Sequence, residues 1–172
     1  MSLRIIPEHI DPFRFAEQNL RLDGTVKTDS MHRLHSNMQL TCDKLHVEFQ
    51  FGVDEQKITF LKGHLQATLT LQCQRCMEPY IYEIMSDFVL GVVSTIEEAN
   101  KLPDMYEPAL AKNGELALRE LIEDELILNL PIIPRHDPVD CKVQGSLAGT
   151  GWQAGEKPNP FHVLNSMKNK EK

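Results

Sequence analysis

The sequence predicts an α+β fold in which an antiparallel β-sheet of three or more long strands is packed by one main helix, with short helices toward the termini. Three observations lead to this prediction. Apolar and polar side chains alternate over most of residues 38–92, as in half-buried strands. Short polar turns without helical stretches separate these strands, which favours antiparallel neighbours. One stretch with helical spacing of apolar residues follows, over residues 115–130.

The segment before the sheet predicts two short helices joined by a turn. Asp11 is suited to cap a helix over residues 11–21, because Pro12 then occupies the first helical position, where a missing N–H costs nothing. The Asp23-Gly24 pair indicates a turn. A Thr-Asp-Ser sequence predicts the cap of a second helix over residues 28–34.

Three long strands are predicted in order along the chain. The first changes parity near Asp43-Lys44, which indicates a β-bulge or a break. The second follows a polar turn over residues 52–56 and is interrupted at Gly63. The third begins after the turn that contains two cysteines. The alternating apolar positions are Met38, Leu40, Cys42, Leu45, Val47, Phe49 and Phe51 in the first strand, Ile58, Phe60, Leu65, Ala67, Leu69, Leu71 and Cys73 in the second, and Tyr80, Tyr82, Ile84, Phe88, Leu90 and Val92 in the third.

The main helix follows a polar connection that contains two prolines, over residues 94–113. Pro131 is expected to end this helix. The apolar positions on its buried face are Leu118, Leu121, Ile122 and Leu126. Prolines and glycines are frequent in the segment beyond it, which predicts a loose, exposed conformation. We therefore expect one α+β domain over residues 1–145 and a C-terminal extension over residues 146–172.

The charge of the chain is acidic and unevenly distributed. The net charge is −7, and residues 93–145 alone carry −6, whereas residues 146–172 carry +2. Binding to naked RNA rests mainly on cationic contacts with phosphate, so this balance argues against a broad RNA-binding surface. The chain contains no apolar stretch suited to a signal sequence or a membrane span, and we expect a cytoplasmic protein without a membrane partner.

The most informative motif is Cys73-Gln74-Arg75-Cys76, a CxxC at the hinge between two predicted strands. Such a hinge can direct two thiolates toward one point, and zinc is commonly held by cysteine and histidine side chains. Candidates for the remaining ligands complete a Cys3His set, which is Cys73, Cys76, His136 and Cys141. Zinc held by four protein ligands would be structural, because no open position is left for water. A redox pair and plain structural thiols are the alternatives.

Acidic residues cluster on the predicted main helix at Glu120, Glu123, Asp124 and Glu125. The ordinary interpretation of such a cluster is a solvated helix face. Paired carboxylates can also serve acid–base or divalent-metal chemistry. A third interpretation makes Glu123, Asp124 and Glu125 contacts for a basic partner. Glu125 falls near the apolar stripe, where it could instead pair with Arg135 or with another buried cation.

The C-terminal extension contains a candidate docking segment. Pro158, Asn159 and Pro160 precede Phe161, so that two prolines pre-extend the chain before an apolar anchor. The alternative is that Phe161 packs onto its own domain. The lysine-containing tail over residues 168–172 could add weak contacts with phosphate.

Four segments in this order resemble the large ribosomal RNA subunit accumulation protein family, YceD: residues 71–79 (LQCQRCMEP), 123–131 (EDELILNLP), 134–141 (PRHDPVDC) and 157–161 (KPNPF). The resemblance implies a role in the synthesis, processing or stability of 23S ribosomal RNA in the bacterial cytoplasm. It implies no established enzymatic activity and no agreed catalytic residues. Some relatives carry further CxxC pairs near the C-terminus, which favours a metal; this chain has His136 and Cys141 in place of a second pair.

We therefore expect a non-enzymatic ribosome-biogenesis factor that acts through protein contacts, with ribosomal precursor particles or with ribosomal and assembly proteins. It would contact 23S ribosomal RNA indirectly or through the basic tail, and no small-molecule substrate is expected. A zinc-stabilised, stand-alone RNA-binding module is the alternative. A metal-dependent nuclease that uses the helix carboxylates is a third hypothesis, although the sequence contains no GxSxG, HExxH, P-loop or GxGxxG motif.

Overall fold

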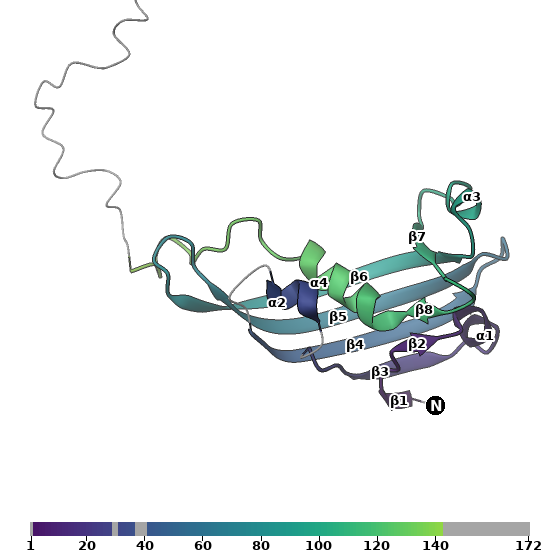
Figure 1. Ribbon diagram of the computed structural model, residues 1–172, viewed down its shortest axis with the longest axis horizontal. Coiled ribbons are helices and arrows are strands. Elements are labelled where there is room, and N and C mark those ends of the chain that lie inside the picture. Colours follow the sequence, from purple (N-terminus) through teal and green to yellow (C-terminus); the bar gives the residue numbers. More distant parts are fainter. Residues whose placement is uncertain (1, 29–30, 37–40, 143–172) are drawn as a thin grey trace, which may run out of the picture.

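The computed structural model describes residues 2–28, 31–36 and 41–142, and its centre is a six-stranded sheet (Figure 1). The strand order is β1-β3-β4-β5-β6-β7, and β2 pairs with β8 in a second, two-stranded sheet. The strands are β1 (Ser2–Ile5), β2 (His9–Ile10), β3 (Arg21–Thr25), β4 (Thr41–Val53), β5 (Thr59–Gln72), β6 (Pro79–Val93), β7 (Glu107–Leu110) and β8 (Leu116–Ala117). The helices are α1 (Pro12–Glu17), α2 (His32–Ser36), α3 (Ile96–Ala99) and α4 (Leu118–Leu128).

The expected antiparallel sheet is confirmed in its long strands, whereas both edges differ from the expectation. β3, β4, β5 and β6 pair antiparallel in that order. At the edges, β1 runs parallel to β3, and β7 runs parallel to β6. Sequence alternation missed β7 because it has only four residues, and its backbone gains its hydrogen bonds from β6 and not from a local turn.

The predicted irregularity in the first long strand is confirmed, and the one predicted in the second is wrong. The register of β4 against β5 shifts between Cys42 and Lys44. Gly63, by contrast, lies inside the unbroken strand β5 and pairs with Phe88 of β6. A Cβ atom on Gly63 would lie 2.1 Å from Cζ of Phe88, so the missing side chain leaves the place that this ring fills. Phe88 in turn meets the ring of Phe49 edge-on.

Asp11 caps α1 as predicted, but the helix ends early. Oδ1 of Asp11 accepts hydrogen bonds from the N–H groups of Phe13 and Arg14 at 3.1 and 3.0 Å. The chain reverses at Asn19, whose φ is 48°, and enters β3. The turn expected at Asp23-Gly24 is therefore wrong, because both residues pair with β4.

Helices α2 and α4 lie on the same face of the large sheet (Figure 1). The predicted main helix is α4, which is shorter than residues 115–130. Its side chains Leu118, Ile122 and Leu126 are fully buried and join Phe49 and Leu65 of the sheet in the hydrophobic core. Alternate β5 positions point away from this core and are polar, among them Lys62, His64, Gln66, Thr68 and Thr70.

Parts of the prediction fall beyond the described ranges. The C-terminal extension over residues 146–172 lies outside them, and so do its candidate docking residues Pro158, Asn159, Pro160 and Phe161. Among the helices of the described ranges, none combines the length and the apolar content that a membrane crossing requires.

Candidate metal centre

Two loops bring the predicted Cys3His set together. Cys73 follows the last residue of β5 and Cys76 lies three residues before β6, so both occupy the hairpin tip. His136 and Cys141 come from the segment after α4. The four candidate ligand atoms lie within 4.8 Å of one another. The fourth cysteine of the chain, Cys42, is not part of this group.

The donor set and its spacing fit tetrahedral zinc. Zinc binds sulfur at about 2.3 Å, which places two sulfur ligands of a tetrahedron about 3.8 Å apart. Sγ of Cys76 lies 3.3 Å from Nδ1 of His136, a separation that neighbouring ligands can adopt around one ion. Cys73 and Cys141 are fully buried, whereas Cys76 and His136 are half-buried. Only small movements of these side chains are needed to close the site around an ion.

The backbone of the hairpin tip favours a thiolate at Cys73. Burial alone would favour the neutral thiol, but hydrogen bonds from the N–H groups of Cys76, His136 and Arg75 outweigh it and lower the pKa of Cys73 to about 5. The turn that aims these groups places Met77 in the left-handed region, with φ at 62°. The thiolate is the form that binds a metal ion, so the loop is arranged for a ligand before any ion binds.

The electrostatics of Cys76 also favour a cation at this position. Burial raises the pKa of Cys76, and the neighbouring sulfur atoms of Cys73 and Cys141 raise it further, because additional negative charge there is repelled. A divalent cation between the sulfur atoms would remove this repulsion and deprotonate the thiols. A metal ion bound at this cluster would therefore balance the negative charge of the thiolates.

Arg75, which lies between the two cysteines of the CxxC motif, is a contributor that sequence reasoning missed. Its Nε donates a hydrogen bond to Sγ of Cys141 at 3.0 Å. Its Nη2 atom is buried and has no hydrogen-bond partner among the described residues. Three thiolates around one divalent ion leave a net charge of −1, which a guanidinium beside Cys141 balances.

Backbone contacts hold the segment after α4 against the hairpin tip. Gln74 N–H donates to the carbonyl oxygen of Pro134 at 2.9 Å. The N–H groups of Asp140 and Cys141 both donate to the carbonyl oxygen of Asp137, and this turn directs Cys141 inward. The four ligands come from two segments separated by all of β6, β7 and α4, so an ion here would fasten the end of the described chain to the sheet.

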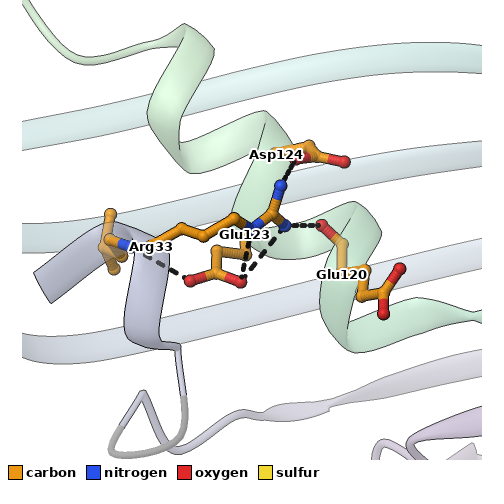
Figure 2. A network of polar contacts seen from close by, with 5 residues as sticks. Arg33, Glu120, Glu123 and Asp124 are labelled. Atoms are coloured by element: carbon orange, nitrogen blue, oxygen red, sulfur yellow. Dashed lines mark hydrogen bonds and ion pairs between the residues drawn. The ribbon is translucent and has the colours of Figure 1, made fainter. Parts of the chain in front are cut away.

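Two of the predicted partner-binding carboxylates, those of Glu123 and Asp124, meet the same side chain, Arg33 (Figure 2). Glu123 is buried, and its carboxylate accepts hydrogen bonds from Leu34 N–H at 3.0 Å and from Arg33 Nε at 3.2 Å. Arg33 also pairs with Asp124, at 2.5 Å between Nη1 and Oδ1. Burial raises the pKa of Glu123, but the hydrogen bonds from Leu34 and Arg33 outweigh it and hold the pKa below its ordinary value. Glu123 thus fastens α2 to α4 and is not presented to solvent.

Glu125 has a separate set of partners, and the expected pairing with Arg135 is not among them. Its Oε1 atom accepts hydrogen bonds from Ser86 Oγ at 2.6 Å and from Asn129 Nδ2 at 2.9 Å. The sequence placed Glu125 near the apolar stripe of α4, but it did not predict Ser86 of β6 as a neutral partner. No periodicity within α4 could reveal it, because the sheet supplies Ser86.

These features define a class of protein: an α+β protein built on a six-stranded mixed sheet, with a candidate Cys3His metal centre at the tip of its β5–β6 hairpin. The chain belongs to the family described as "Large ribosomal RNA subunit accumulation protein YceD", whose model matches residues 61–168. The matched region contains the complete Cys3His set and α4.

A curated relative supports the same assignment over nearly the full chain. The "Large ribosomal RNA subunit accumulation protein YceD" of Haemophilus influenzae (strain ATCC 51907 / DSM 11121 / KW20 / Rd) is 34% identical over 169 residues, which cover 96% of this chain and 97% of the relative. No solved structure matches this chain significantly.

Proposed function

We propose that this chain is a non-enzymatic ribosome-biogenesis factor that supports the accumulation of 23S ribosomal RNA in the bacterial cytoplasm. The observation that carries the proposal is the 34% identity, over nearly the full length of both chains, to a relative named for the accumulation of large-subunit ribosomal RNA. The factor acts through contacts with ribosomal precursor particles, or with ribosomal and assembly proteins. Its contact with 23S ribosomal RNA is indirect or runs through the basic tail.

The engagement of the helix carboxylates supports a role without catalysis. A two-metal or acid–base site needs carboxylates that converge on one reacting position. Here Glu123 and Asp124 are held by Arg33, and Glu125 is held by Ser86 and Asn129. Held by these partners, they are better suited to structure than to hydrolysis of a phosphodiester.

The Cys3His centre has a structural role in this proposal. Zinc is the metal that the donor set favours, because three thiolates and one imidazole form a closed tetrahedral site. Cys73, Cys76, His136 and Cys141 would hold the ion and leave no position for a substrate or a reactive water. Its contribution is to fix the segment after α4 against the tip of the β5–β6 hairpin.

Metal analysis tests the centre directly. The purified full chain is expected to contain one zinc ion per chain by plasma mass spectrometry. Cys76→Ser or His136→Ala should reduce the zinc content to background, because three ligands bind zinc far more weakly than four. Cys42→Ser is the matched control, since Cys42 lies outside the group, and it should retain the ion. Four freely titrating thiols and no zinc in the wild-type chain would remove the metal from the proposal.

A deletion strain of the source bacterium tests the cellular role. The ratio of 23S to 16S ribosomal RNA is expected to fall in the deletion strain and to return when the wild-type chain is expressed from a plasmid. Sedimentation of the tagged chain with large-subunit precursors should accompany this recovery. An unchanged ratio in the deletion strain, together with no sedimentation on precursors, would refute the proposed function.

The stand-alone RNA-binding module is separated from this proposal by one binding measurement. That alternative requires tight binding of the zinc-loaded chain to 23S fragments, with affinity that falls steeply as salt rises. A net charge of −7 opposes such binding. We expect weak binding to naked 23S fragments, and nanomolar binding to them would favour the alternative.

A further inference from the structure

A groove of about 530 Å³ lies between α4 and the edge strand β7. Its floor contains the buried side chains of Leu90, Ala109 and Leu116, and its rim contains two exposed leucines. Leu110 is 39% exposed and Leu128 is 76% exposed. Apolar side chains that remain open to solvent beside a hollow are typical of a surface that another molecule covers.

A second hollow of about 510 Å³ continues this groove across the end of α4. The two hollows share Glu107, Glu125 and Leu128 in their linings. The second hollow adds Met105, which is 67% exposed. Together they form one continuous surface, which we call the β7 groove.

The charge of the β7 groove is strongly one-sided. Two lysines, Lys62 and Lys112, face a larger number of carboxylates, which are Asp87, Asp104, Glu107, Glu115, Glu120, Asp124 and Glu125. By comparison, a neighbouring hollow that shares Lys62 and Asp87 with the β7 groove balances its charge more evenly, with two cations against three carboxylates. The β7 groove is therefore where the acidic excess of residues 93–145 gathers around apolar surface.

Much of this negative charge is not compensated within the described part of the chain. Asp87 contacts His64, Asp124 pairs with Arg33, and Glu125 accepts hydrogen bonds from Ser86 and Asn129. In contrast, the ion pairs among the described residues do not include Asp104, Glu107, Glu115 or Glu120. Figure 2 shows the carboxylate of Glu120 directed away from Arg33, although its backbone oxygen accepts a hydrogen bond from that side chain.

From these observations we propose that the β7 groove docks a lysine- or arginine-rich protein segment that also carries apolar side chains. The apolar side chains would cover Leu110, Leu128 and Met105, and the cations would meet the four uncompensated carboxylates. Charge complementarity identifies the occupant as a cationic polypeptide, since phosphates of RNA would be repelled by the same carboxylates. The inference rests on the proposed function, in which the partner is a protein of the ribosomal particle, and it names the surface that receives this partner.

Fluorescence anisotropy with defined peptides tests the proposal. The probes are fluorescein-labelled peptides of 20 residues that tile the proteins of the bacterial large ribosomal subunit, a peptide of residues 153–172 of this chain, and a 20-nucleotide RNA. Each is titrated with the zinc-loaded full chain. Peptides with high positive charge and apolar residues are expected to bind most tightly, with Kd values that rise with salt concentration.

Matched charge reversals locate the binding surface. Glu107→Lys combined with Glu115→Lys changes the groove, whereas Glu55→Lys combined with Glu83→Lys makes the same change in net charge at exposed positions outside it. We expect the groove variant to weaken binding of the best peptide about tenfold or more, and the control variant to change it less than about twofold. Leu128→Ser, which leaves the charge unchanged, should weaken binding several-fold through loss of an apolar contact. Thermal unfolding of each variant confirms that the sheet is intact.

Several outcomes would overturn the inference. Equal weakening by both double variants would mean that net charge alone drives binding. Tightest binding of the 153–172 peptide would make the chain's own tail the occupant, and displacement of peptides by the RNA would make the surface a nucleic-acid site. If the groove variant fully restores 23S ribosomal RNA in the deletion strain, the groove inference fails while the proposed function stands. If deletion leaves 23S levels unchanged, the proposed function fails, whatever the peptides do.

Discussion

Glu123 offers the sharpest test of how this fold is held together. It is a buried carboxylate with an 8% exposed side chain, and it connects two elements that are 89 residues apart, α2 and α4. Glu123→Gln preserves the shape of the side chain and removes the charge. One oxygen then remains for Leu34 N–H, and the new amide group faces the guanidinium of Arg33, which is also a donor.

The magnitude follows from the contacts that are lost. Hydrogen bonds to a charged group contribute about 1.5–3 kcal/mol. Arg33 is 51% exposed and keeps its ion pair with Asp124, so solvent and the remaining partner offset part of the loss. We therefore expect Glu123→Gln to lower the free energy of unfolding by about 1–2 kcal/mol. Glu123→Ala should cost about 3 kcal/mol, because the buried N–H of Leu34 then has no acceptor.

Urea unfolding of the full chain at pH 7, followed by circular dichroism, measures these differences. If the slope of the unfolding free energy against urea concentration is the same in the variant and the wild type, the variant has changed only the stability. The matched control is Glu120→Gln, one turn away with an exposed carboxylate, which should remain within about 0.5 kcal/mol of the wild type. The reasoning is refuted if Glu123→Gln is as stable as the wild type, or if the control loses as much.

The stability that Glu123 contributes depends on pH in a direction that follows from its pKa. The pKa of Glu123 in the folded chain lies below its unfolded value, which is about 4.3. Below pH 4.3 the unfolded state therefore binds the proton more readily, and stability falls as the pH falls through the folded pKa. The difference in the free energy of unfolding between the wild type and Glu123→Gln should be largest at pH 6–7 and should decrease below about pH 4. Comparison of the two chains at each pH cancels the effect of titrating groups that both chains share.

Three further predictions concern the sheet, the first helix and the metal centre. Gly63→Ala should destabilise the chain by about 1–3 kcal/mol in thermal unfolding, because the new Cβ overlaps the ring of Phe88; Phe88→Leu in the same chain should recover part of the loss, and an unaffected Gly63→Ala chain would contradict the packing. Asp11→Ala should lower the free energy of unfolding by about 1 kcal/mol through loss of the α1 cap, and a change below about 0.3 kcal/mol would argue against it. A strong chelator should lower the Tm of the wild type and of Cys42→Ser equally. Cys76→Ser should have this lower Tm before the chelator is added and should not respond to it. A response of Cys76→Ser to the chelator would place the ion elsewhere.

Local sequence rules recovered the features whose causes are local. The cap at Asp11 was predictable because its partners are two and three residues away. The parity change seen in the sequence near Asp43-Lys44 corresponds to the register shift between Cys42 and Lys44, because the alternation of side chains follows the register of a strand. The Cys3His set was predictable from ligand types, since few residue types bind zinc and the CxxC fixes two of the four ligands.

Features that depend on distant strands were not recoverable in this way. Asp23-Gly24 is a frequent turn sequence, yet the pairing of β3 with β4 overrides that local preference. Gly63 suggested a break in the second strand, whereas the ring of Phe88 from β6 fills the space above it. The pattern also gave no sign that Glu123 is buried, because the helix that covers it is α2 and not a neighbour in sequence.

By itself, the sequence determined an acidic α+β protein with a long antiparallel sheet, a main helix and a Cys3His group of candidate metal ligands. Tertiary structure alone decided that β1 and β7 close the sheet in parallel, that Glu123 and Asp124 share Arg33 while Glu125 meets Ser86 and Asn129, and that an acidic, partly apolar groove lies beside β7. The physical reason is one of range. Periodicity and capping arise from neighbours a few residues away, whereas register at the edges, burial of charge and the shape of a surface depend on which distant segments come into contact.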